Sequence, residues 1–154
     1  MELIERDTFY IYGYAVETTA EQNDADVSRL FADFFDAGKD AGLRNLHGTG
    51  AGYYGLLWYT QGHEKYCYLL GVEADENNPI PAGALKKELC KTTFAVEHFP
   101  KSKDAIEAWT EFFYTDIPKE GLAPNAQYNM YFEYYPEDVD GDYQLWVPVV
   151  KADG

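Results

Sequence analysis

The most informative stretch of the chain reads Asn129-Met130-Tyr131-Phe132-Glu133-Tyr134-Tyr135-Pro136. Large side chains on both faces of such a strand indicate that it is covered on both sides, so we expect Glu133 to lie among aromatic rings. A buried carboxylate without a partner costs several kcal/mol. No Lys or Arg occurs in this strand or the next turn, which makes a cation from outside the chain a candidate partner. A solvated strand face and a salt bridge to a distant Lys are the alternatives.

The surrounding segments predict one structural unit. An Asp-Gly turn at 138–142 joins this strand to an aromatic strand at 143–149, which gives a hairpin. A strand is predicted at 92–98, and helical spacing follows it in Ala105, Ile106, Trp109, Phe112 and Phe113. The second half therefore reads strand, helix, strand, strand.

The first half repeats this order. A strand is predicted at 9–16, and strands at 53–60 and 65–73 form a hairpin. The clearest helix of the chain lies between the first strand and this hairpin. Its apolar face consists of Val27, Leu30, Phe31, Phe34 and Phe35. The order of elements is thus the same in both halves.

This duplication predicts an α+β fold. Two β-α-β-β units, at about 7–75 and 85–150, would form one antiparallel sheet with two helices on one face. Both units would belong to a single domain over residues 1–154. A cleft between the repeats would be the place for a ligand, because such interfaces commonly hold ligand sites.

Composition narrows the class of partner. The formal net charge of -15 opposes binding to a phosphate backbone and would attract cations. The N-terminus lacks a basic head and a long apolar run, and no segment is long enough to span a bilayer, so we expect a cytoplasmic protein without a nucleic-acid or membrane partner.

Two motif matches fail on context. Gly50-Ala51-Gly52-Tyr53-Tyr54-Gly55 has the spacing of a dinucleotide-binding loop, but it opens a strand instead of a helix. Asp138-Val139-Asp140-Gly141-Asp142 resembles a calcium loop with its Gly misplaced, and a hairpin turn explains it. His47, His63 and His98 are scattered. We therefore predict neither a metal nor a cofactor.

Aromatic residues supply the candidate site. They make up 17% of the chain, and Tyr and Trp each carry a polar group that a plain core would have to satisfy. Strand alternation places Tyr131, Glu133 and Tyr135 on one face. The predicted ligand-binding residues are Glu133, Tyr54, Trp58, Tyr68, Trp109, Phe112, Tyr131 and Tyr14, with Phe113 as the alternative to Phe112. No catalytic residue is assigned, except Glu133 if the protein is a hydrolase.

Five segments of the chain, by their order and spacing, indicate a resemblance to a known family. They are Phe9-Tyr10-Ile11-Tyr12-Gly13-Tyr14, Tyr54-Gly55-Leu56, Tyr68-Leu69-Leu70-Gly71-Val72-Glu73, Phe132-Glu133-Tyr134 and Trp146-Val147-Pro148-Val149. With them the chain resembles the GyrI-like, or AraC-type, effector-binding domains that detect drugs in bacteria. The resemblance implies two strand-helix-strand-strand repeats with a pocket between them. It also implies that Glu133 lies at the bottom of an aromatic pocket and faces lipophilic cations.

The resemblance also bears on partners. Many relatives carry a DNA-binding domain ahead of this unit, whereas few residues precede the first predicted strand here. The chain is therefore similar to the stand-alone, integron-associated effector-binding proteins, and a transcriptional role would require a separate DNA-binding regulator. One stand-alone branch resembles an enzyme that hydrolyses cyclopropane-containing DNA alkylators.

Three hypotheses follow for the function. The leading one is a binding module for lipophilic cationic compounds, present as a monomer or weak dimer, that senses or sequesters drugs. The second is a xenobiotic hydrolase in which Glu133 directs a water or donates a proton. The third is a protein-interaction subunit whose aromatic residues are only core. Multiple turnover distinguishes the second hypothesis, and a lack of any small-molecule ligand distinguishes the third.

Overall fold

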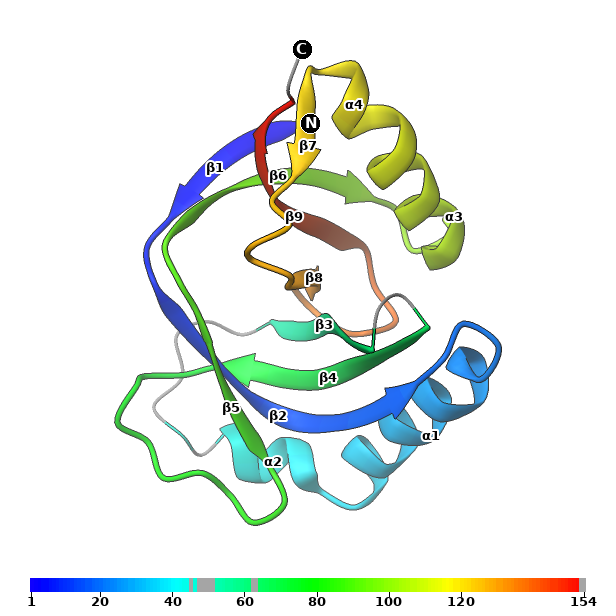
Figure 1. Cartoon of the computed structure of the whole chain (residues 1–154). Helices are drawn as coiled ribbons and strands as arrows, with labels where there is room; N and C mark the ends of the chain where they lie inside the picture. Colours follow the sequence, from blue (N-terminus) through cyan, green and yellow to red (C-terminus); the bar gives the residue numbers. More distant parts are fainter. Residues whose placement is uncertain (45, 47–51, 62–63, 153–154) are drawn as a thin grey trace.

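The computed structural model describes residues 1–44, 46, 52–61 and 64–152. In this part of the chain, a sheet of nine strands curls into a half-barrel (Figure 1). The first half contributes β1 (Glu2–Arg6), β2 (Phe9–Thr18), α1 (Asn23–Asp36), α2 (Lys39–Arg44), β3 (Tyr53–Gln61) and β4 (Lys65–Glu73). The second half contributes β5 (Leu85–Leu89), β6 (Thr92–Phe99), α3 (Ala105–Glu111), the π-helical turn η1 (Phe112–Asp116), α4 (Ile117–Lys119), β7 (Leu122–Pro124), β8 (Tyr131–Tyr135) and β9 (Tyr143–Lys151).

The predicted duplication is confirmed. One unit is β2-α1-β3-β4 and the other is β6-α3-β8-β9, and the strands pair in the order β1-β6-β9-β8-β3-β4-β2-β5. The two units meet where β3 pairs with β8 in antiparallel fashion. At this junction Gly55 lies directly opposite Glu133, and Leu57 lies opposite Tyr131. The middle of the sheet therefore contains the candidate carboxylate.

Strands β1 and β5 were not predicted, and they join the outer edges of the two units. β1 pairs with β6 and β2 pairs with β5, both antiparallel and in one continuous register from Glu2↔Val96 to Gly13↔Leu85. The sequences of β1 and β5, Glu-Leu-Ile-Glu-Arg and Leu-Lys-Lys-Glu-Leu, are rich in charge, and only Leu89 among their residues is buried. Their pairing with distant strands, rather than a local pattern of apolar residues, makes them strands.

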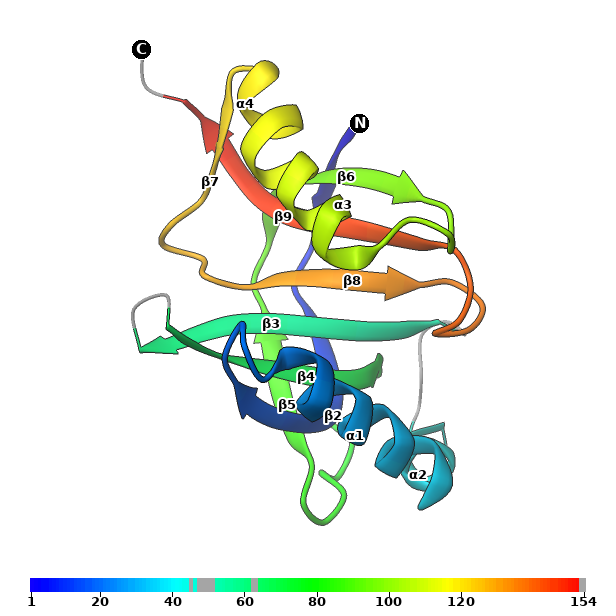
Figure 2. The same cartoon turned by 90° about the vertical axis from the view of Figure 1, so that its right-hand side faces the viewer.

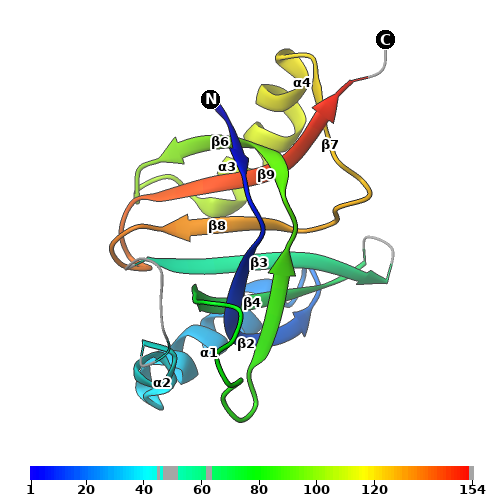
Figure 3. The same cartoon turned by 90° about the vertical axis from the view of Figure 1, so that its left-hand side faces the viewer.

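Apolar side chains pack on both faces of the sheet. α1 and α3 cover the same face, one over each unit (Figure 2), and a separate buried cluster lies beneath each of them, around Phe34 and Phe112 respectively. A third cluster, which includes Leu56 and Phe132, fills the other face. On that side β1 and β5 cross the sheet (Figure 3). The α+β class with two main helices on one face is thus confirmed.

The structure describes only part of the two rejected motifs. Gly50 and Ala51, like His47 and His63, lie outside the described residues, whereas Tyr53 to Gly55 belong to β3. Asp138 to Gly141 forms a turn, in which the Gly141 N–H donates to the Asp138 carbonyl at 2.9 Å. Over the described ranges, no helix is both long and apolar enough to cross a membrane.

Candidate functional site

Two connected compartments lie between the helices, above the junction of β3 and β8. The larger, which we call the acidic compartment, has a volume of about 460 Å³, with Val27 and Phe31 of α1 on one side, Ile106 and Trp109 of α3 on the other, and Glu133 in its lining. The smaller, which we call the aromatic compartment, has a volume of about 220 Å³. The shared walls are Leu57, Tyr59, Tyr66, Trp109 and Thr110. The predicted cleft between the repeats is therefore present.

Glu133 is buried and held by neutral groups. Its side chain is 6% exposed. The Tyr68 and Tyr135 hydroxyls donate to Oε1 at 2.7 and 2.9 Å, and the Trp109 indole N–H donates to Oε2 at 2.9 Å. These donors come from three different elements, β4, β8 and α3. The carboxylate is thus fixed in position by groups from both repeats.

No opposite charge accompanies this carboxylate within the described residues. None of the ion pairs found among them includes Glu133. Every buried side-chain nitrogen and oxygen in the same residues has a hydrogen-bond partner. A carboxylate can accept about four hydrogen bonds, so the neutral donors on Glu133 leave acceptor capacity on Oε2. Its charge is hydrogen-bonded but not neutralised.

Gly55 makes the hydrogen bond from Tyr68 possible. Tyr68 lies on β4, Gly55 on β3 and Glu133 on β8, so the phenol must cross over β3 to reach the carboxylate. A Cβ added to Gly55 would lie 2.1 Å from Tyr68 Oη and 2.9 Å from Glu133 Oε1. Only glycine at this position leaves room for the crossing.

The two phenols keep their protons to high pH. Burial, and then the Glu133 charge, raises the pKa of Tyr68 well above the ordinary value of 10.0. The same two causes raise the pKa of Tyr135. Burial is also the largest cause that raises the pKa of Tyr66 to about 12. The hydroxyls beside Glu133 therefore act as hydrogen-bond donors, not as bases.

The raised pKa of Tyr68 predicts a loss of stability in alkali. Below about pH 10 both the folded and the unfolded chain keep the proton, but above it only the unfolded chain releases it. The free energy of unfolding then falls by about 1.4 kcal/mol per pH unit for each buried phenol. We expect Tyr68→Phe to flatten this decline by about that amount, measured by urea unfolding between about pH 9 and pH 11.

Ile106→Ala is the control for this experiment, because Ile106 also lines the acidic compartment, is 58% exposed and carries no group that titrates. Its alkaline slope should equal that of the wild type. An unchanged slope in Tyr68→Phe would contradict the assignment of Tyr68 as a protonated donor. The slope is the informative quantity, since loss of the hydrogen bond lowers stability at every pH.

Comparison with known proteins decides the family. The sequence matches the profile of Cass2, integron-associated effector binding protein, over residues 2–149. The chain belongs to this effector-binding family. The resemblance drawn from the sequence is therefore confirmed. A comparison with curated protein sequences finds no match to this chain.

Solved structures share the fold of this effector-binding protein. SAV2435 bound to tetraphenylphosphonium is 18% identical with a TM-score of 0.76, and the match covers 97% of this chain and 93% of that chain. An integron cassette protein from Vibrio cholerae is 15% identical with a TM-score of 0.69, covering 97% of this chain and 95% of that one. A putative transcription regulation protein from Staphylococcus aureus is 17% identical with a TM-score of 0.72, with 96% of both chains covered.

Five of the residues predicted for the ligand site lie at the two compartments. Glu133 and Tyr68 line the acidic compartment, Trp58 and Tyr131 line the aromatic compartment, and Trp109 lines both. They come from β3, β4, β8 and α3, so both repeats of the effector-binding fold contribute. Their contacts with a ligand remain predictions.

The structure does not place Tyr14, Tyr54 or Phe112 in the lining of either compartment. Tyr14 packs beside Phe34, with 6.4 Å between ring centroids. Tyr54 points to the opposite face of the sheet, where its hydroxyl donates to Glu73 at 2.8 Å. The alternation of side chains along β3 places Tyr54 on the face opposite to that of Leu57, which lines both compartments.

Phe112 is fully buried in the core beneath α3, and its neighbour Phe113 lines the aromatic compartment instead. The π-helical turn explains this arrangement. It lets Phe112 and Ile117, five residues apart, share the core face. Trp109 and Phe113, four residues apart, share the face toward the compartments.

Sequence reasoning left several lining residues out of the predicted set. Tyr135 donates directly to Glu133, and Tyr59 and Tyr66 line both compartments. The alternation of Tyr131, Glu133 and Tyr135 already contained the signal for Tyr135. Tyr59 and Tyr66 pair across the β3–β4 hairpin, so its register was needed to find them.

Proposed function

We propose that this effector-binding protein binds lipophilic cations, with Glu133 as the counter-charge and the aromatic side chains as the walls of the site. One observation carries the proposal: a buried carboxylate faces a cavity, and its hydrogen-bond donors among the described residues are the neutral side chains of Tyr68, Tyr135 and Trp109. A cation that enters the acidic compartment would neutralise it.

The energies involved favour a ligand that is both charged and apolar. Attraction between unit charges about 4 Å apart is worth about 4 kcal/mol at an effective dielectric constant of about 20, before desolvation is subtracted. Each ring face against the cation adds about 0.5 to 2 kcal/mol, and apolar burial adds about 25 cal/mol per Å². The formal net charge of -15 also raises the local concentration of cations. Micromolar affinity for cations of varied shape is the expected outcome.

The bound tetraphenylphosphonium in the SAV2435 structure supports this class of ligand, because that protein has the same fold. In the proposed role, the protein would sense or sequester such compounds in the cytoplasm as one unit over residues 1–154. A transcriptional response would then need a separate DNA-binding regulator.

Calorimetric titration of the purified protein tests the proposal. We expect methyltriphenylphosphonium to bind with a micromolar dissociation constant, and the neutral triphenylphosphine oxide to bind at least about tenfold more weakly. Affinity for the cation should also fall as salt is raised from about 20 mM to about 500 mM. Equal affinity for the charged and neutral compounds would contradict the role of Glu133. Multiple turnover of an electrophilic substrate, measured separately, would favour a hydrolase.

A further inference from the structure

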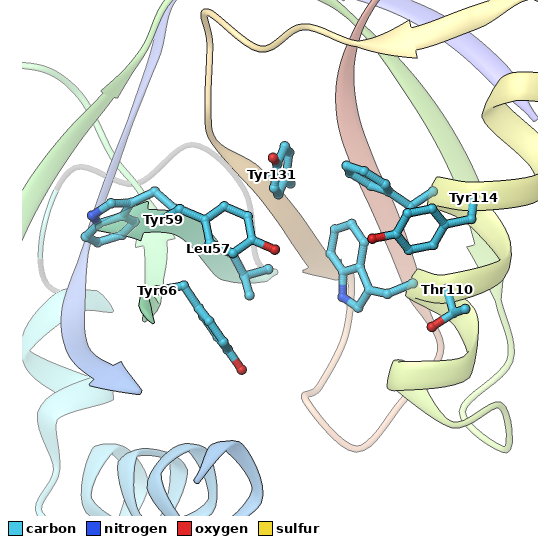
Figure 4. Close-up of a pocket in the computed structure, with 9 residues that line it drawn as sticks. Leu57, Tyr59, Tyr66, Thr110, Tyr114 and Tyr131 are labelled. Atoms are coloured by element: carbon cyan, nitrogen blue, oxygen red, sulfur yellow. The ribbon is translucent and has the colours of Figure 1, made fainter. Parts of the chain in front are cut away.

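The aromatic compartment has a different chemistry from the acidic one. Among the described residues, all of its lining side chains except Leu57 and Thr110 are aromatic, and none is a carboxylate. Tyr59 and Tyr66 face it from the β3–β4 hairpin, and Tyr114 faces it from the helical side (Figure 4). Its volume of about 220 Å³ far exceeds the roughly 10–15 Å³ that one water requires. It is therefore large enough for a ring system.

Trp109 connects the two compartments. Its indole N–H donates to Glu133 Oε2 at 2.9 Å, on the side of the acidic compartment. Its ring also borders the aromatic compartment, 6.3 Å between centroids from Tyr131, which in turn lies 5.5 Å from the Phe113 ring. A single ligand that extends past Trp109 would reach both compartments.

The two compartments differ in charge. Glu133 gives the acidic compartment a negative charge. The described residues that line the aromatic compartment include no charged side chain. The charged centre of a ligand is therefore favoured beside Glu133.

From this arrangement we propose that the aromatic compartment is a subsite for a neutral, flat aromatic arm. The inference rests on the proposed function and narrows it: the preferred ligand of this chain is an elongated cation, with its charged centre at Glu133 and an aromatic arm between Phe113 and Tyr59. A compact cation would fill only the acidic compartment. Flat rings suit this subsite because aromatic side chains surround it on several sides.

Three phosphonium ions test the subsite by calorimetry. They are ethyltriphenylphosphonium, its 2-(2-naphthyl)ethyl analogue, and the decahydronaphthyl analogue, which is not flat. We expect the naphthyl ion to bind about tenfold more tightly than the ethyl ion, and the saturated ion to gain at most about threefold.

Variants then assign the gain to the subsite. In Phe113→Ala the ratio of the ethyl to the naphthyl dissociation constant should fall from about ten to about two. Tyr114→Ala should also lower this ratio and is safe for folding, since Tyr114 is 74% exposed. Ile106→Ala is the matched control: Ile106 lines only the acidic compartment and is 58% exposed. It should leave the ratio near ten.

The outcomes separate this inference from the proposed function. A wild-type ratio near one, with the ethyl ion still bound, would overturn the subsite and leave cation binding intact. An equal gain for the saturated ion, or an equal drop of the ratio in Phe113→Ala and Ile106→Ala, would also overturn it. Failure of all the phosphonium ions to bind would overturn both proposals.

Discussion

The Glu133→Gln variant should bind tetraphenylphosphonium about 100-fold more weakly than the wild type. The substitution keeps the size of the side chain and removes its charge. Of the roughly 4 kcal/mol of attraction at an effective dielectric constant of about 20, we expect about 2.7 kcal/mol to remain after desolvation, which corresponds to this change in affinity. Calorimetry on both proteins in one buffer measures it.

The matched control for this prediction is Glu137→Gln. Glu137 is exposed and lies just after β8, so its substitution removes the same single charge without touching the acidic compartment. Its affinity should stay within about twofold of the wild type, since a distant surface charge acts only through the screened field. A Glu133→Gln dissociation constant within about threefold of the wild type would refute the proposed role of this carboxylate.

The Gly55→Ala variant should lose both stability and cation binding. The added Cβ would lie 2.1 Å from Tyr68 Oη and 2.6 Å from Tyr68 Cζ, and Tyr68 is only 3% exposed, so the ring has nowhere to move freely. We expect a loss of about 1–3 kcal/mol in the free energy of unfolding. Affinity for tetraphenylphosphonium should fall at least about tenfold, because Tyr68 no longer fixes the carboxylate. Urea unfolding and calorimetry give the two values.

Two further variants show whether Gly55 acts through Tyr68. Gly42 in α2 has no atom within 4 Å of an added Cβ, so Gly42→Ala should leave affinity unchanged and stability equal or slightly higher. In a Tyr68→Leu background the phenol is absent, and adding Gly55→Ala should then cost less than about 1 kcal/mol. A cost that is equally large in both backgrounds would mean that Gly55 serves the backbone alone.

The rejected dinucleotide motif contains Gly55, a residue whose role depends on the tertiary structure. Gly55 does not belong to a phosphate-binding loop, because the strand β3, and not a helix, begins there. No pattern in the sequence indicates, however, that this glycine lies opposite Glu133 and beneath Tyr68. That role depends on the pairing of β3 with strands from both halves of the chain.

The same distinction applies to the aromatic residues. Alternation along β8 correctly placed Tyr131 and Glu133 on one face, because both residues belong to one strand. It could not show that Tyr54 lies on the opposite face, or that Tyr14 packs beside Phe34 of α1, so both are in the predicted set although neither lines a compartment. The π-helical turn similarly exchanged Phe112 for Phe113 at the site.

The sequence by itself determined the duplicated β-α-β-β unit, the α+β class and the acid among aromatic residues. Each of these follows from spacing within a short segment, which reflects local backbone geometry. Only the tertiary structure decided which rings surround Glu133, that its partners Tyr68, Tyr135 and Trp109 are neutral, and that β1 and β5 join the two units. These features depend on the register between strands far apart in the chain, and a shift of one residue in that register would turn every side chain to the other face.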